Sequence, residues 1–120
     1  MARATAGGYV PERGDIVRLD FDPQSGHEQK GRRPAVVLSP AAYNRRAGLA
    51  VLCPITRQAK KYPFEVAIPA GLAVTGVILA DQLKSLDWQS RRAEYLCALP
   101  EDTLFEVVDR AMTLIDPEEG

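Results

Sequence analysis

Histidine and cysteine are scarce in this chain, which has one histidine and two cysteines among its 120 residues. Cys53 and Cys97 stand far apart and form no CxxC pair, so the spacing that metal ligands need is missing. We therefore expect no metal and no cofactor. The same spacing neither requires nor excludes a disulfide, and we expect both residues to be packed, reduced thiols.

Long apolar runs are missing as well. The first ten residues, MARATAGGYV, contain no continuous apolar segment of the kind found in signal peptides. The other apolar stretches fall well short of the roughly 20 residues that a membrane span requires, so we expect a cytoplasmic protein. A hydrophobic content of 46% suits one compact domain with a real core. We assign residues 1–8 to a flexible N-terminus, 9–116 to a single domain and 117–120 to an acidic tail.

A strong net charge is also lacking, since the formal value is -1, and this argues against a general nucleic-acid binder. The charges are nevertheless unevenly distributed. Residues 27–61 hold eight basic side chains and one acid, Glu28, so this segment carries +7 and the remainder -8. Such a run is either a solvated face or a basic surface that concentrates a polyanion. In the second case the acidic remainder limits indiscriminate binding.

The apolar pattern predicts a mainly β protein. Alternating or continuous apolar residues favour strands at residues 14–21, 35–39, 49–56, 64–68, 76–81 and 94–99. Pro54 has no amide hydrogen to donate, so its strand should lie at a sheet edge or be bulged there. Several short strands closed by a helix suggest a small barrel.

Two helices are expected. Ser39 as cap and Pro40 in the first turn predict a short helix between the second and third strands. Near the C-terminus, Leu104, Val108, Ala111, Met112 and Ile115 recur at helical spacing between Pro100 and Pro117. This spacing predicts one amphipathic helix.

The segment HEQKGRRPAVVL (residues 27–38) joins a charged half to an apolar half. The apolar half is typical of a buried strand, and the charged half is typical of the loop that leads into it. We interpret residues 27–33 as an anion-binding loop at the edge of the barrel. The alternative is that the loop is merely solvated and that Glu28 pairs with Lys30 or Arg32, which at a surface contributes little.

Several blocks, in this order and at these spacings, resemble the MazF/PemK family of toxins. They are YVPERGDIVRLDFDP (9–23), GHEQKGRRPAVVLSP (26–40), YN (43–44), CPITRQAKKYPFEV (53–66) and ADQLKSLDW (80–88). The resemblance implies a small SH3-like barrel of the CcdB/PemK type with peripheral helices, usually a homodimer. It also implies metal-independent, sequence-specific cleavage of single-stranded mRNA, and neutralisation by an acidic, flexible, MazE-like antitoxin.

The implied chemistry is attack of a ribose 2′-OH on the adjacent phosphorus, which leaves a 2′,3′-cyclic phosphate and a 5′-OH. Arg33 matches the catalytic arginine of the family, and a guanidinium is suited to a phosphate oxygen because it is planar and always charged. Thr56 matches the catalytic threonine. Glu28 corresponds to an acidic position in relatives, and we infer that it accepts the 2′-OH proton. His27 is a second candidate for this proton transfer.

Other polar side chains are candidates for RNA recognition. Amide side chains that could contact base edges are those of Gln29, Asn44 and Gln82. Cationic side chains that could contact phosphates are those of Lys30, Arg32, Arg57, Lys60, Lys61 and Lys84. Asp81 belongs to the same sequence block as Gln82 and Lys84. Tyr43, Tyr62 and Trp88 could stack on bases, or could belong to the core or to a dimer contact. Closeness to relatives that cut at ACA makes an ACA-containing site our first expectation.

Two other classes of function remain open. Barrels of this kind also occur in toxins that inhibit DNA gyrase without cleaving anything, and in SH3-like modules that bind acidic peptides. Arg33 and Thr56 have no required role in either. Taken alone, each residue also has a purely structural interpretation. Arg33 could be a surface residue before a strand, and Thr56 could be a turn former.

Overall fold

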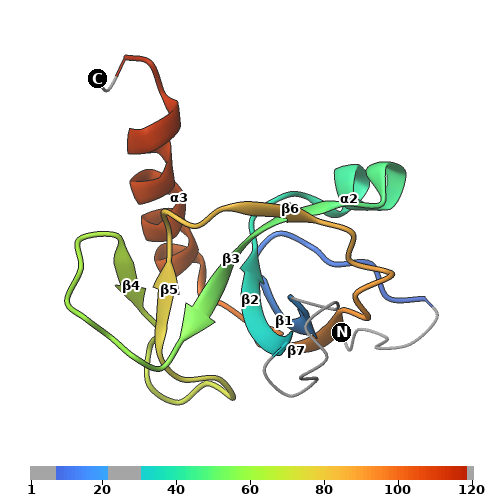
Figure 1. Ribbon diagram of the computed structural model, residues 1–120, viewed down its shortest axis with the longest axis horizontal. Helices are drawn as coiled ribbons and strands as arrows, with labels where there is room; N and C mark the ends of the chain where they lie inside the picture. Colours follow the sequence, from blue (N-terminus) through green and yellow to red (C-terminus); the bar gives the residue numbers. More distant parts are fainter. Residues whose placement is uncertain (1–7, 22–30, 119–120) are drawn as a thin grey trace.

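The computed structural model describes residues 8–21 and 31–118. Its strands are β1 (Asp15–Asp20), β2 (Arg32–Val37), β3 (Ala50–Thr56), β4 (Glu65–Ala67), β5 (Val77–Leu79), β6 (Lys84–Leu86) and β7 (Glu94–Ala98). The helices of the described residues, α2 (Ala41–Ala47) and α3 (Glu101–Ile115), lie at the periphery (Figure 1). Within the described residues, no helix is both long and apolar enough to cross a membrane.

All strand pairs are antiparallel, in the order β4-β5-β3-β2-β1-β7, with β6 added to β3. This arrangement confirms the predicted mainly β fold with a C-terminal amphipathic helix. The barrel is an open one, because no ladder joins β4 to β7 in the part of the chain that is described. Helix α3 contacts β4 and so covers one end of the sheet.

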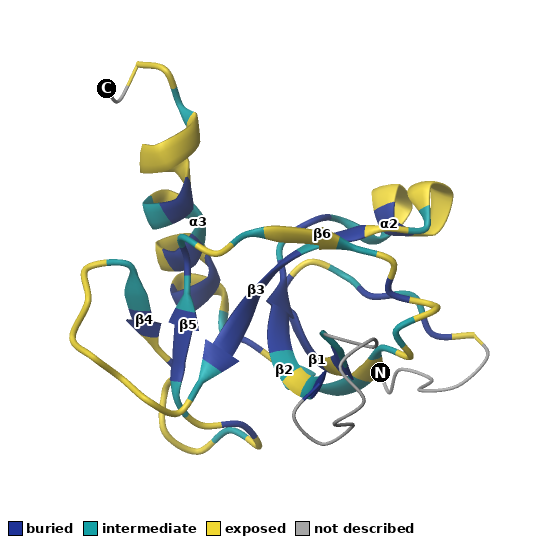
Figure 2. Cartoon of the chain, viewed as in Figure 1, coloured by how far each residue is buried: buried dark blue, intermediate teal, exposed yellow. Residues whose placement is uncertain are grey.

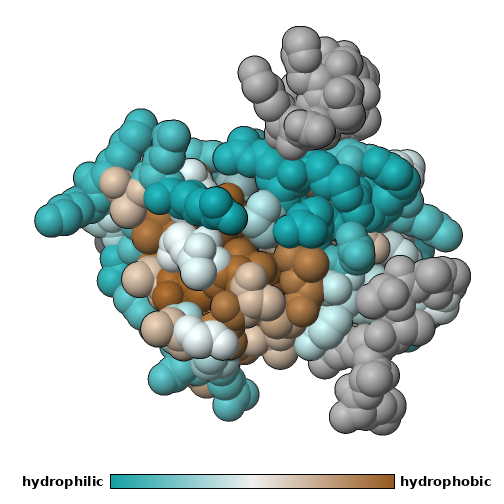
Figure 3. Space-filling model, turned by 90° about the horizontal axis from the view of Figure 1, so that it is seen from below, coloured by the Kyte–Doolittle hydropathy of each residue, from teal (hydrophilic) through white to brown (hydrophobic). Residues whose placement is uncertain are grey.

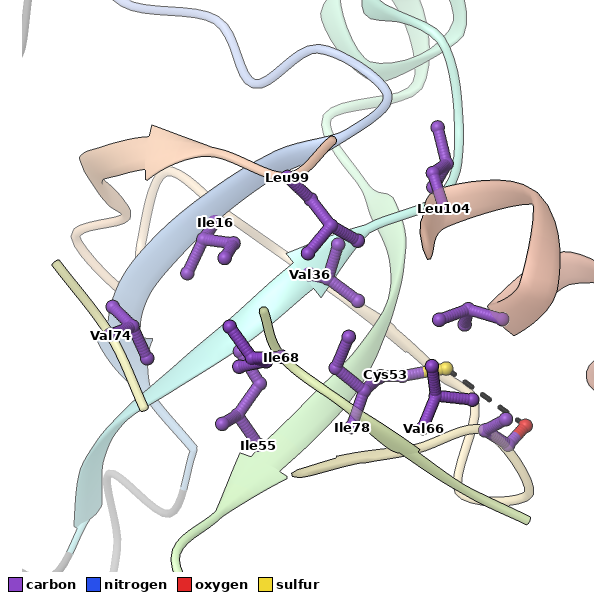
Figure 4. Packing of buried hydrophobic residues seen from close by; sticks show 12 residues of the cluster. Ile16, Val36, Cys53, Ile55, Val66, Ile68, Val74, Ile78, Leu99 and Leu104 are labelled. Carbon is purple, nitrogen blue, oxygen red and sulfur yellow. Dashed lines mark hydrogen bonds between the residues drawn. The ribbon is translucent and has the colours of Figure 1, made fainter. Parts of the chain in front are cut away.

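Most of β1 and β3 and the second half of β2 are buried, as the dark ribbons in Figure 2 show. Because side chains alternate along a strand, these strands contribute to two cores. One core packs the sheet against β4, β5 and α3 (Figure 4), and it contains Ile16, Val36, Cys53, Ile55, Val66, Ile78, Leu104 and Val107. The other contains Val17, Leu19, Ala35, Val37, Leu52, Tyr9 and Trp88.

The expected edge position of the strand with Pro54 is wrong. Strand β3 pairs with β2 on one side and with β6 and then β5 on the other, so it lies inside the sheet. Leu52 pairs with β6 and Ile55 with β5, so the change of partner falls at Cys53 and Pro54. A residue without an amide hydrogen is tolerated there because no ladder bond is required on that side.

The expected cap of the first helix is also wrong. Pro40 is the N-cap of α2 and supplies no side-chain hydrogen bond, whereas the amide of Ala41, the first helical residue, donates to Glu12 Oε1 at 2.8 Å. The Ser39 hydroxyl instead donates to Asn44 Oδ1 at 2.6 Å and accepts the Val51 amide at 2.9 Å. Ser39 therefore ties α2 to β3.

The predicted C-terminal helix forms, but its apolar stripe is only partly covered. Leu104 and Ala111 are buried, whereas Met112 is 42% exposed and Ile115 is 57% exposed. The end of α3 extends past the sheet, as Figure 2 shows, and residues 112–115 of its last turn are exposed. Strand β6 was not predicted because it is short and its KSL sequence lacks an apolar alternation.

Candidate nucleic-acid site

Arg33 and Thr56 lie on neighbouring antiparallel strands. Ala35 of β2 pairs with Pro54 of β3, and the same register, continued by two residues, places Arg33 opposite Thr56. Such cross-strand partners are within reach of each other's side chains. Arg33 is exposed and Thr56 is partly buried. Two residues far apart in the sequence are thus brought together at the end of the sheet.

Both residues line two adjoining hollows. The larger, of about 610 Å³, is bounded by the 58–65 turn and the end of β5. The smaller hollow, of about 310 Å³, is lined by Arg18 and Arg57 in addition to Arg33 and Thr56. Figure 3 views the molecule from below and shows hydrophilic residues gathered along an apolar area on this face. Because Arg33 and Thr56 line both hollows, we treat them as one groove.

The groove carries mainly positive charge. Arg33, Lys60 and Lys61 line the larger hollow, with Glu65 and Asp81 as its acids. Arg18, Arg33 and Arg57 line the smaller one, which has no acid among its lining residues in the described chain. A concave surface with several cations attracts an anionic chain and holds it by its phosphates.

The position of Thr56 is determined by the backbone around it. The Gln58 amide donates to Thr56 Oγ1 at 3.2 Å, so the hydroxyl keeps its own hydrogen free to donate. Gly76 has a φ of +124°, and a Cβ built there would lie 2.3 Å from the Thr56 carbonyl oxygen. Only glycine allows β5 to approach β3 so closely at this point.

Arg32, predicted to bind RNA, is engaged elsewhere and lines neither hollow. Its guanidinium contacts Asp20 at 3.2 Å and Glu94 at 3.3 Å and donates to the Arg92 carbonyl at 2.9 Å. The hydrogen bond from Arg92 and, less strongly, that from Arg32 hold the pKa of Asp20 below its ordinary value. The structure gives Arg32 a structural role in place of the predicted RNA contact, because these carboxylates already pair its charge.

Asn44, also predicted to read bases, is fully buried. Its side-chain amide donates to the carbonyls of Pro11 and Ser39, at 2.8 and 3.0 Å. The backbone carbonyl of Asn44 accepts the Trp88 indole N–H at 2.9 Å. With every group paired inside the protein, Asn44 and Trp88 are structural, and neither can contact RNA without unfolding this region.

The remaining predicted residues divide into three groups. Lys60, Lys61 and Gln82 line the larger hollow and Arg57 the smaller one. Lys84 is exposed on β6 and Tyr43 on α2, and neither lines a hollow. His27, Glu28, Gln29 and Lys30 lie outside the described residues.

Among the charged and amide side chains that line the groove, sequence reasoning missed three, Arg18, Gln58 and Glu65. Arg18 had a signal, because it occupies a polar position in an otherwise apolar strand. Nothing in the sequence of the other two sets them apart from ordinary surface residues.

Both cysteines are free, and Cys53 is buried in the first core. Burial, and secondarily the charge of Asp81, raises the pKa of Cys53 to about 12. Its thiol therefore stays protonated and unreactive at neutral pH.

The chain is similar to characterised toxins over most of its length. It is 53% identical over 85 residues to the endoribonuclease toxin MazF of Escherichia coli K12, which spans 71% of this chain and 76% of that protein. The crystal structure of MazF from Deinococcus radiodurans superposes with a TM-score of 0.82 at 59% identity, covering 89% of this chain and 97% of that one. A MazE-MazF crystal structure from the same organism gives a TM-score of 0.83 at 56% identity, with the same coverage.

The family model for the PemK-like, MazF-like toxin of type II toxin-antitoxin systems matches residues 12–115. This range contains every described strand, both described helices and the Arg33 and Thr56 groove. The resemblance seen in the sequence is thereby confirmed, and the chain belongs to the PemK-like, MazF-like toxin family.

Proposed function

We propose that this protein is a sequence-specific endoribonuclease that cleaves single-stranded RNA in the cytoplasm and acts there as a growth-inhibiting toxin. The observation that carries the proposal is that Arg33 and Thr56 line the same basic groove. Relatives with a similar chain are named endoribonucleases, which favours cleavage over gyrase inhibition or peptide binding.

The proposed reaction needs no metal. A ribose 2′-OH loses its proton and its oxygen attacks the adjacent phosphorus. The bond to the 5′-oxygen breaks and that oxygen takes a proton from water, so the products are a 2′,3′-cyclic phosphate and a 5′-OH. Arg33 stabilises the charge that develops on the phosphoryl oxygens, because its planar guanidinium can donate two parallel hydrogen bonds to them. Thr56 donates its free hydrogen to the same phosphate. Glu28, outside the described residues, is our candidate for accepting the 2′-OH proton.

The cognate partner is proposed to be an acidic, flexible antitoxin. Solved MazF structures from Deinococcus radiodurans include complexes with MazE, a precedent at 53–56% identity. The +7 segment supplies a surface on which an acidic chain would compete with RNA. We further propose that the protein is a homodimer and that its recognition site contains ACA.

The decisive test is incubation with a long single-stranded RNA in EDTA, followed by mapping of cut sites and end groups. We expect discrete cuts with cyclic-phosphate ends, lost in Arg33→Ala and kept in Arg46→Ala. Arg46 is a matched control because it is an exposed arginine on α2 outside both hollows. Intact RNA from the folded wild type would reject the proposal, and a gyrase supercoiling assay would then test the alternative.

A further inference from the structure

An exposed aromatic ring lines the larger hollow together with Arg33. Tyr62 is 46% exposed, and its ring lies 5.8 Å from that of Phe64 at 48°. Its hydroxyl donates to Asp81 Oδ2 at 2.7 Å, and this bond is the main cause of the raised pKa of Tyr62. An exposed tyrosine held at its far end cannot swing freely, so the face of its ring has a defined orientation.

The backbone that carries Tyr62 is also held in place. The Glu65 carboxylate accepts the amides of Lys60 at 2.9 Å and Lys61 at 3.0 Å. Lys61 has a φ of +56°, a left-handed conformation that is uncommon for a residue with a side chain. The Glu65 amide in turn donates to the Tyr62 carbonyl at 2.9 Å. The turn is therefore closed on both sides of Tyr62.

The Asp81 carboxylate lies in an unfavourable environment. Its Oδ1 atom is buried and has no hydrogen-bond partner within the described residues. A buried, unpaired carboxylate oxygen costs folding free energy, and a smaller or apolar side chain would avoid that cost. What the carboxylate supplies is the bond that holds Tyr62.

The surroundings of the ring suit one kind of ligand. Lys60, Lys61 and Arg33 line the same hollow and can hold the phosphates of a single strand. Proteins bind single strands by combining such cations with aromatic faces on which bases stack. The hollow, of about 610 Å³, also has the amide of Gln82 on its wall. Phosphate contacts and a fixed ring face thus occur in one hollow.

We propose that Tyr62 is the stacking platform for one nucleobase of the bound RNA, and that Asp81 is a positioning residue which orients this platform. The inference rests on the proposed ribonuclease function and adds a base subsite to it. A rigid ring loses little conformational freedom when a base stacks on it, so the Asp81 bond increases affinity through preorganisation.

The binding test uses RNA oligonucleotides with 2′-deoxy substitution at the cleavage site, which prevents cutting. The fluorescent base 2-aminopurine replaces each base in turn, and its fluorescence is quenched when it stacks. We expect one position to be quenched on binding to the wild type, and the quenching to be lost in Tyr62→Leu. Quenching unchanged in the folded Tyr62→Leu variant would overturn the proposal.

Tyr43→Leu is the matched control. Tyr43 is 43% exposed, close to the value for Tyr62, but it lies on α2 outside both hollows. We expect wild-type quenching and affinity from this variant. An equal loss in both variants would show a general effect of removing surface aromatics and would also overturn the proposal.

Coupling between Tyr62 and Asp81 is tested by a double-mutant cycle on KM. Tyr62→Leu should raise KM roughly 5- to 100-fold with little change in kcat. Tyr62→Phe and Asp81→Ala should each raise KM by a smaller, similar factor, and the double variant by no more than either one, because both remove the same bond. Additive effects would refute the positioning role of Asp81. A wild type that cuts no RNA would instead refute the proposed function, so the two failures are distinguishable.

Discussion

Arg32 and Arg33 are neighbours of the same type, yet their environments differ in the respect that matters for function. Arg32 is paired with two carboxylates, whereas Arg33 projects into the groove opposite Thr56. A guanidinium that is already paired is less available to a phosphate. This difference supports our proposal that Arg33 is catalytic and that Arg32 is structural.

The first prediction separates these roles. Arg33→Ala should lower the cleavage rate by about two to three orders of magnitude, because a donor to the transition state is lost. Its melting temperature should stay within a degree or two of the wild type, since Arg33 is exposed. Arg32→Ala should show the reverse pattern, with a lower melting temperature. Full activity in Arg33→Ala would remove the proposed phosphate role.

The second prediction concerns Asp20, whose pKa is lowered by Arg92 and Arg32. A lowered folded-state pKa adds stability above the unfolded pKa, and this stability is lost as pH falls through the folded value. Asp20→Asn should therefore destabilise the protein by about 1 to 2 kcal/mol at pH 7. The difference in unfolding free energy, measured by denaturant titration, should shrink below about pH 4. A constant difference down to pH 2 would contradict the ion-pair explanation.

The third prediction uses the thiols. Because burial raises the pKa of Cys53 to about 12, its thiol should not react with a disulfide reagent at pH 8 in the native protein. Cys97 is partly exposed and should account for any native reactivity. Both thiols should react in denaturant. Rapid native labelling of Cys53, located by mass spectrometry, would show that this core opens readily.

At the scale of elements, the approach of β5 to β3 depends on one residue. Gly76 lies where a Cβ would meet the Thr56 carbonyl at 2.3 Å. Gly71 also has a positive φ, of +95°, but nothing lies within 4 Å of a Cβ built there. An alanine at Gly71 would therefore introduce backbone strain alone, whereas an alanine at Gly76 would add a steric clash with Thr56.

The fourth prediction follows from this comparison. Gly71→Ala should cost about 1 kcal/mol of stability from backbone strain and leave cleavage nearly unchanged. Gly76→Ala should cost at least about 2 kcal/mol and also lower the cleavage rate, because β3 must shift at Thr56. Thermal unfolding and a cleavage assay on each variant would check this. Equal effects on activity would show that the contact does not position Thr56.

Helix α3 shows how an element can satisfy a sequence pattern and still extend beyond its core. Leu104, Val107 and Ala111 pack against the sheet, while Phe105 and Ile115 are each 57% exposed. The apolar positions near the helix end have the spacing of a buried stripe, but the sheet does not reach them. Only the extent of the sheet decides where burial along the helix stops.

At the scale of the whole molecule, the net charge of -1 conceals a segment of +7. The structure brings part of that segment into the groove as Arg33, Arg57, Lys60 and Lys61. Attraction to RNA should therefore be local to the groove and sensitive to salt.

The fifth prediction is the salt dependence of RNA binding. For single strands the affinity falls with salt with a logarithmic slope of about -0.7 for each phosphate contact. Replacing both Lys60 and Lys61 with glutamine should make the slope shallower by about 1 to 2. Replacing Arg45 and Arg46, exposed on α2, should leave it unchanged. The measurement is the affinity for uncleavable RNA, titrated at salt concentrations between about 50 and 200 mM. Equal slopes for both double variants would show that Lys60 and Lys61 do not contact the RNA phosphates.

By itself the sequence determined the fold class, the approximate positions of most strands and the family. Alternation of apolar residues favours strands with opposite faces, and the five sequence blocks, taken together in their order and spacing, indicated the toxin family that the family model confirms. These features are local, because they depend on residues close together along the chain.

Only the tertiary structure decided which of several similar polar residues reach the groove. Asn44 and Gln82 both offer a side-chain amide. Asn44 is buried and bonded to Pro11 and Trp88, whereas Gln82 lies on the wall of the larger hollow. The Asp20 and Glu94 carboxylates likewise remove Arg32 from the groove. The physical reason is that burial and pairing arise between residues far apart in the chain, whose proximity is set by strand register and packing.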